Sequence, residues 1–147
     1  MENKINNNYP QLFLRFALGI ALWSAVADRL GCWPQQYAAW GNMENFIAYT
    51  GKIIAFLPSG LATTNAYLAT FAESVLGLLL MVGFKLRWTA TLTGLMLMAF
   101  ALCMSLTLGI KAPFDYSVWV GSAGAFLLAN LASFPFSIDA LIAKKSE

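Results

Sequence analysis

Long apolar runs separated by short polar stretches are the dominant pattern along this chain of 147 residues. Four runs are long enough to cross a bilayer, since a helix rises about 1.5 Å per residue and the hydrocarbon core is ~30 Å thick. They cover residues 12–30, 66–84, 88–110 and 116–134. The last three lack the polar stripe, repeated every 3.6 residues, that a soluble helix would show. The pattern therefore predicts an all-α integral membrane protein with a four-transmembrane-helix bundle over residues 12–134.

The first connection, residues 31–65, is long for a helix bundle and contains one more apolar stretch. Residues 46–57 are apolar around Lys52 and stop at a Pro-Ser-Gly turn. This stretch is too short to span the bilayer. It predicts a short interfacial helix in the first outer loop, or a lid over the outer end of the bundle.

Composition supports the membrane interpretation, because 59% of the residues are hydrophobic and only 11% are charged. A soluble domain has about 25% charged residues. The ends are more polar, so residues 1–11 are predicted as a disordered cytoplasmic tail and residues 135–147 as a second cytoplasmic tail. The net charge of +2 and the lack of a basic stripe argue against a nucleic-acid partner. The first partner is expected to be the lipid bilayer.

Basic residues are unevenly divided between the two ends of the predicted bundle, which indicates its orientation. One end carries Lys4, Arg15, Lys85, Arg87, Lys144 and Lys145. The other end carries Arg29, Lys52 and Lys111. The bias predicts a multi-pass protein of the inner (plasma) membrane with both termini in the cytoplasm. Arg15 is expected to extend to the cytoplasmic headgroups.

Glu73 is an isolated carboxylate inside the second apolar run. A charge in hydrocarbon costs at least ~2.5 kcal/mol, so such residues usually face a protein interior and have a function there. Small residues on the same helical face predict that Glu73 points at a neighbouring helix. Proton handling or ligand anchoring is the functional interpretation. The alternative is a structural ion pair with Arg29 or Lys111.

The outer half of the bundle is predicted to gather the other candidate side chains. A ligand-binding site there would use Asp28, Arg29, Glu73, Thr107, Lys111 and Asp115. Cys103 is a candidate catalytic thiol, with a small apolar core residue as the alternative. The two cysteines form no CxxC pair, and the chain has no histidine. No haem, metal or nucleotide is therefore expected.

Two sequence blocks have a distinctive order of residues. One runs from Glu73 through Gly77 and Gly83 to the basic turn at Lys85 and Arg87, and the other is the Arg-Phe-Ala-Leu-Gly run at residues 15–19. Together they resemble the DoxX family. Residues 46–58 are similar to the family's outer-loop helix. The resemblance extends from residue 12 to residue 131. The chain departs from the family pattern at residues 27–30, where an acid is added to the end of the first helix.

The resemblance implies a small four-helix membrane protein. Some members of the family are membrane subunits of thiosulfate:quinone oxidoreductase. It therefore predicts a membrane subunit of a quinone-linked redox system with a polar pocket around Glu73. Quinone would be the redox group, or a soluble or membrane partner subunit would supply the cofactor. The alternatives are a non-enzymatic membrane anchor or scaffold and a protein that binds a lipophilic small molecule. Catalytic activity and homo-oligomer formation both stay open.

Overall fold

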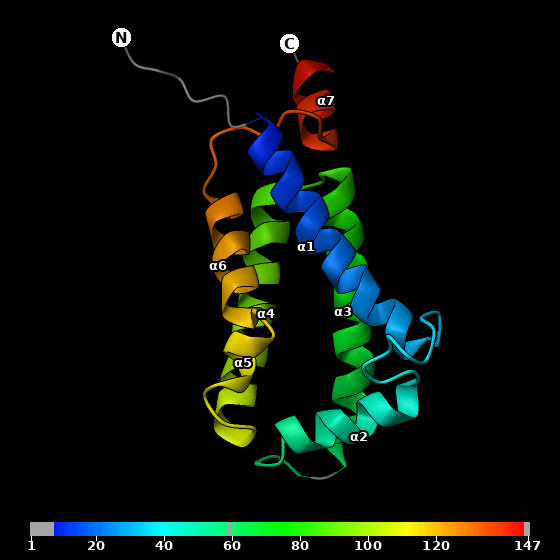
Figure 1. Cartoon of the computed structure of the whole chain (residues 1–147). Helices are drawn as coiled ribbons and strands as arrows, with labels where there is room; N and C mark the ends of the chain where they lie inside the picture. The colour runs from blue at the N-terminus through cyan, green and yellow to red at the C-terminus, as the bar shows by residue number, and fades with distance from the viewer. Residues whose placement is uncertain (1–7, 59, 146–147) are drawn as a thin grey trace.

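The computed structural model describes residues 8–58 and 60–145, and this part of the chain is helical without strands (Figure 1). Its helices are α1 (Asn8–Arg29), α2 (Met43–Ile53), α3 (Leu61–Val82), α4 (Leu86–Thr107), α5 (Ala112–Asp115), α6 (Val118–Ala129) and α7 (Ile138–Lys145). The first helix already includes residues 8–11, so the prediction of disorder there is wrong. Residues 1–7 of that predicted tail lie outside the described residues.

Helices α1, α3 and α4 are long and apolar enough to cross a membrane. The buried shares of their most apolar windows are only 33%, 28% and 33%. Most of each apolar surface therefore faces outward, as a lipid-facing helix requires. The helix predicted over 66–84 begins earlier, at Leu61, because its polar first turn continues the helix beyond the apolar run.

The fourth predicted span, residues 116–134, is shorter than expected. Its helix, α6, has 12 residues, which is about 18 Å of helix. Ser117 has a left-handed backbone with φ 55° and separates α6 from the short α5. At the other end, the Asn130 side chain donates back to the Phe126 carbonyl (2.8 Å) as the helix stops.

Four helices pack as two pairs, α1 against α3 and α4 against the shorter α6 (Figure 1). Two glycines bring α1 and α3 together. A Cβ at Gly19 would lie 2.9 Å from the Gly77 carbonyl oxygen, and a Cβ at Gly77 would lie 3.1 Å from the Gly19 oxygen. Trp23 locks the same contact, since its indole donates to the Ser74 carbonyl (3.1 Å). Close approach of small residues is how helices associate without a hydrophobic driving force.

Helix α2 lies across the ends of α3 and α4 and also contacts α1 (Figure 1). The predicted helix at 46–57 is therefore present, with bounds shifted to Met43–Ile53. Its start is fixed by Asn42, whose side chain accepts from the Asn45 backbone N–H (2.8 Å). This N-cap satisfies one of the free donors of the first turn. The helix covers one end of the α1–α3 pair.

Arg15 is fully buried, with 0% of its surface exposed. Its guanidinium donates from Nε to Leu80 O (3.0 Å), from Nη2 to Met81 O (3.0 Å) and from Nη1 to Phe136 O (3.1 Å). The expectation that Arg15 reaches the headgroups is wrong. The last carbonyls of α3 have no partner within the helix and carry the negative end of its dipole, so a buried cation satisfies them.

The predicted cytoplasmic tail over 135–147 contains a helix, α7, that is attached to the bundle, and residues 146–147 lie outside the described residues. Asp139 at the start of α7 accepts from the backbone N–H groups of Lys85 (2.7 Å) and Leu86 (2.8 Å). Its own N–H donates to Gly83 O (3.0 Å). Gly83 has φ +75°, and a Cβ there would lie 2.5 Å from Arg15 Nη2. We call Arg15, Gly83 and Asp139 the C-terminal clasp, because together they attach the end of the chain to the α3–α4 turn.

Candidate functional site: a buried ion pair under an aromatic cover

Arg29 and Glu73 form an ion pair between the last residue of α1 and the middle of α3. Arg29 Nη1 lies 2.7 Å from Glu73 Oε2, and the two side chains are 3% and 4% exposed. The same nitrogen donates to Thr70 Oγ1 (3.0 Å). Glu73 therefore faces a neighbouring helix, and of the two ion-pair partners considered from the sequence, Arg29 is the one in contact.

Two aromatic rings cover the guanidinium. Arg29 Cζ lies 3.6 Å from the centre of the Phe46 ring and 5.2 Å from that of Trp40. The two rings meet edge to face, with centroids 4.9 Å apart. Each cation–π contact contributes about 0.5–2 kcal/mol, with the larger values in desolvated sites. Phe46 of α2 and Trp40 of the loop before it thus close the end of the ion pair.

The ion pair is incompletely satisfied. Arg29 Nε and Glu73 Oε2 are both buried and have no hydrogen-bond partner among the described residues. Oε2 nevertheless lies 2.7 Å from Nη1 in the ion pair, so Nε is the group left without any partner of opposite charge or polarity. A buried donor or acceptor left unpaired costs about 1–3 kcal/mol. Arg29 Nε is therefore a buried donor without an acceptor, beside a carboxylate that the same guanidinium holds in place.

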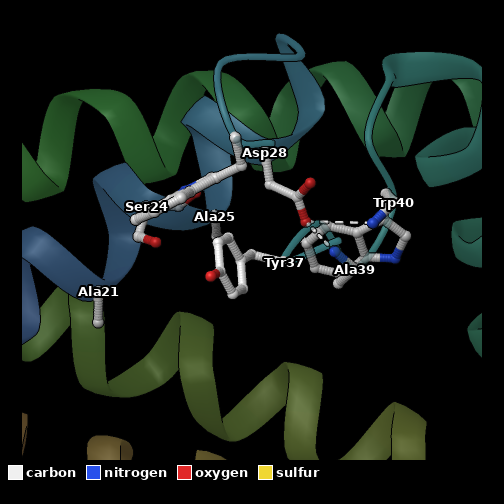
Figure 2. Close-up of a pocket in the computed structure, with 8 residues that line it drawn as sticks. Ala21, Ser24, Ala25, Asp28, Tyr37, Ala39 and Trp40 are labelled. Atoms are coloured by element: carbon white, nitrogen blue, oxygen red, sulfur yellow. Dashed lines mark hydrogen bonds between the residues drawn. The ribbon is translucent and has the colours of Figure 1, made fainter. Parts of the chain in front are cut away.

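Asp28 holds the loop beside this ion pair. Its Oδ2 accepts from the backbone N–H groups of Ala39 (2.8 Å) and Trp40 (3.1 Å), and its Oδ1 accepts from Gly41 N–H (2.9 Å). Figure 2 shows the carboxylate turned toward the backbone at Ala39 and Trp40. Asp28 thereby positions Trp40 over Arg29. Its predicted direct contact with a ligand stays a prediction.

An open pocket of about 460 Å³ lies on the small-residue face of α1, next to Asp28 (Figure 2). Its lining is mostly apolar and aromatic, and comprises Ala21, Ser24, Ala25, Asp28, Trp33, Tyr37, Ala39 and Trp40. Trp40 is shared between this pocket and the cover of the ion pair. The volume is in the range of about 300–1,000 Å³ found for small-molecule sites.

Another aromatic residue of α2 lies at the edge of this region. The rings of Tyr49 and Trp40 are 5.6 Å apart. Burial raises the pKa of the Tyr49 phenol, with a smaller contribution from Tyr116. The Tyr49 hydroxyl therefore stays protonated at neutral pH and can donate a hydrogen bond.

The remaining predicted site residues lie on other elements. Lys111 and Asp115 pair with each other at 2.6 Å on α5, where their side chains are 82% and 53% exposed. Thr107 Oγ1 donates within α4 to Cys103 O (2.8 Å) and approaches Ile53 O at the end of α2 (3.4 Å). Cys103 is a free, half-buried cysteine. Within residues 8–58 and 60–145, no hydrogen bond or ion pair joins any of these side chains to the Arg29–Glu73 pair.

Trp40, Phe46 and Thr70 complete the site and were not predicted as site residues. The apolar stretch containing Phe46 was predicted as an interfacial helix or a lid, and neither prediction identifies which ring covers which charge. Thr70 lies one turn before Glu73 on the same face, a spacing that could have indicated it. In the described part of the chain, no group of three or more His, Cys, Asp or Glu residues could hold a metal ion.

A comparison with known protein families identifies the family of this chain. The model of the DoxX family matches residues 11–106, which is more than half of the chain. The chain belongs to the DoxX family. No curated protein and no solved structure matches it. The matched region of this DoxX protein contains both buried arginines, Glu73 and α2, whereas α5, α6 and α7 lie outside it. Family membership and the apolar helices together make it a multi-pass membrane protein.

Proposed function

We propose that this DoxX protein is a membrane subunit of a quinone-linked redox system, and that its Arg29–Glu73 pair binds the quinone head group. The observation that supports this most is the buried ion pair under aromatic rings, in which Arg29 Nε has no hydrogen-bond partner among the described residues and Glu73 Oε2 lies 2.7 Å from Arg29 Nη1. A quinone carbonyl needs a donor, and a quinol hydroxyl needs an acceptor. The flat rings of Trp40 and Phe46 suit a planar head group.

The ion pair gives each residue a separate task. Arg29 would donate to a head-group oxygen and hold its position. Glu73 would accept a proton from a hydroxyl, and the fixed cation 2.7 Å away would offset its charge between proton transfers. The quinone supplies the two-electron, two-proton chemistry when it is bound, and a partner subunit exchanges the electrons. The open pocket next to Trp40 offers room for the lipophilic part of such a molecule.

The same proposal includes the topology. Four spans require α6 to cross the bilayer together with the irregular segments on either side of it, and a shorter span is possible where the bilayer thins locally. The excess of basic residues at the α3–α4 turn and the C-terminus supports a cytoplasmic location for both termini. The Arg29–Glu73 pair and α2 would then lie at the outer surface of the inner membrane.

The test is quinone-dependent turnover by the purified complex carrying Glu73→Gln. Loss of a general base commonly lowers the rate by 10²–10⁴-fold, so we expect a fall of at least about 100-fold. Asp115→Asn, an equally conservative change on α5, serves as the control and should leave turnover unchanged. Wild-type turnover in Glu73→Gln would remove the carboxylate from the reaction.

A non-enzymatic anchor is the second candidate, because the same ion pair also ties α1, α2 and α3 together. The double variant Arg29→Met/Glu73→Leu separates the two functions. An anchor should still co-purify with its soluble partner and support wild-type turnover of the complex. A head-group site should keep the partner and lose the turnover.

A further inference from the structure

A second open pocket lies beside the α3–α4 turn, at the opposite end of the long helices from α2 (Figure 1). Its volume is about 440 Å³, and it is lined by Lys85, Leu86, Arg87, Trp88, Ala132, Phe134 and Asp139. We call it the turn pocket. No residue of it belongs to the site around Glu73. We propose that the turn pocket binds the head group of an anionic phospholipid.

Charge is the first argument. Among the described residues, this end of the bundle carries the five basic residues Arg15, Lys85, Arg87, Lys144 and Lys145 against one acid, Asp139. The α2 end carries three basic residues against four acids: Arg29, Lys52 and Lys111 against Asp28, Glu44, Glu73 and Asp115. The turn pocket therefore lies at the end with the positive excess, which attracts anionic lipid.

The two cations that line the pocket are available to a ligand. Lys85 and Arg87 are both exposed, and neither side chain forms an ion pair among the described residues. Arg15, in contrast, donates to carbonyl groups inside the bundle. The acid in the lining pairs with neither of them: both oxygens of Asp139 accept backbone N–H groups, and its single charge leaves the two cations in excess.

The lining favours a lipid over a free anion. Trp88 is 72% exposed next to the two cations, and tryptophan prefers the headgroup level of a bilayer. It stands in the first turn of α4, a helix of membrane-spanning length. Leu86, Ala132 and Phe134 give the pocket an apolar part that suits the glycerol and upper acyl region. The lipid phosphate would contact Lys85 and Arg87, and the acyl chains would lie beside Trp88. The charged and apolar parts of the pocket would then each face the matching part of the lipid.

The experiment is native mass spectrometry of the full chain, released from mixed micelles that contain equal amounts of phosphatidylglycerol and phosphatidylcholine. The wild type should retain phosphatidylglycerol in preference. Lys85→Gln/Arg87→Gln should lower that preference by about fivefold for each charge removed. Lys52→Gln/Lys111→Gln removes the same charge from the opposite end and should keep the preference. Equal retention of both lipids by the wild type, or an unchanged preference in Lys85→Gln/Arg87→Gln, would overturn the proposal.

A second readout covers the case in which the double variant does not fold. Brominated phosphatidylglycerol should quench tryptophan fluorescence of the wild type more than brominated phosphatidylcholine, and Trp88→Phe should remove that difference. Equal quenching by both lipids contradicts the proposal. Inorganic phosphate should not relieve the quenching; relief would assign the pocket to a soluble phosphate instead. These outcomes are independent of turnover, so the proposal stands or fails separately from the quinone function.

Discussion

Helix α1 carries one buried arginine near each end, and the two have different partners. Arg15 donates to main-chain carbonyls of α3 and of the segment before α7. None of its buried nitrogens lacks a partner among the described residues. Arg29 faces a carboxylate, a threonine and two aromatic rings, and its Nε has no hydrogen-bond partner. The buried nitrogens of Arg15 are all hydrogen-bonded, whereas one of those of Arg29 is not.

Of the two ends of the molecule, only the one that holds Arg29 can respond to a ligand. Carbonyl groups neither titrate nor leave the backbone, so the attraction that holds Arg15 is fixed. The attraction that holds Arg29 depends on the protonation of Glu73 and on side chains that can change rotamer. Chemistry is therefore expected at the Arg29 end, and permanent attachment at the C-terminal clasp.

Arg15→Met should give the largest loss of stability. Three carbonyl oxygens lose a charge-assisted hydrogen bond, and each unsatisfied group costs about 1–3 kcal/mol, so we expect a loss of about 3–9 kcal/mol. Unfolding by detergent, followed by circular dichroism, measures it. Arg87→Met, at an exposed position, is the matched control. A loss below that of the control would show that the carbonyl groups find other partners.

Glu73→Leu should cost about 3–5 kcal/mol, because Arg29 is left as an uncompensated buried charge. Arg29→Met/Glu73→Leu should then recover most of the loss, since an apolar pair of similar size often replaces a buried ion pair without penalty. The same unfolding measurement on the single and double variants forms the cycle. If the double variant were as unstable as Glu73→Leu, Arg29 would stabilise the fold through contacts other than the ion pair. Its structural role would then match that of Arg15.

Gly19→Ala tests the packing between the two arginines. The new Cβ would lie 2.9 Å from the Gly77 oxygen on α3, so the helices must separate, at a cost of about 1–3 kcal/mol. Gly60→Ala is the control, because nothing lies within 4 Å of a Cβ there. Helix separation should also weaken the 2.7 Å ion pair, so Gly19→Ala is expected to reduce turnover as well. Equal stability of the two variants would contradict the close contact.

Asp139→Ala should have the smallest effect of the four, about 0.5–2 kcal/mol, because it removes the acceptor that caps the first turn of α4. Its control is Asp115→Ala, whose exposed ion pair contributes less than about 1 kcal/mol. Thermal unfolding of both variants gives the ranking. If Asp115→Ala were the more damaging change, the clasp would not stabilise the α3–α4 turn.

The apolar runs predicted the long helices well, since hydropathy alone requires α3 and α4 to be helical in lipid. The buried position of Glu73 followed from the small residues on its face. The partners of Arg15 did not follow, because its acceptors are carbonyl groups, which the sequence does not distinguish. The structure does not bring Thr107, Lys111 and Asp115 to Glu73, because a place in the same half of the bundle does not determine which helical faces meet. The shortness of α6 depends on the left-handed Ser117, a conformation that serine seldom signals.

Asp139 reaches back 54 positions along the chain to cap the start of α4. Translation proceeds from the N-terminus, so both helices of that hairpin are made well before the residue that completes their turn. Any product that terminates before position 139 leaves two amide groups of the turn without their acceptor. The α3–α4 turn is therefore fully hydrogen-bonded only in chains that extend to α7. A shorter chain differs from a longer one at this turn, which lies far from its C-terminus in the sequence.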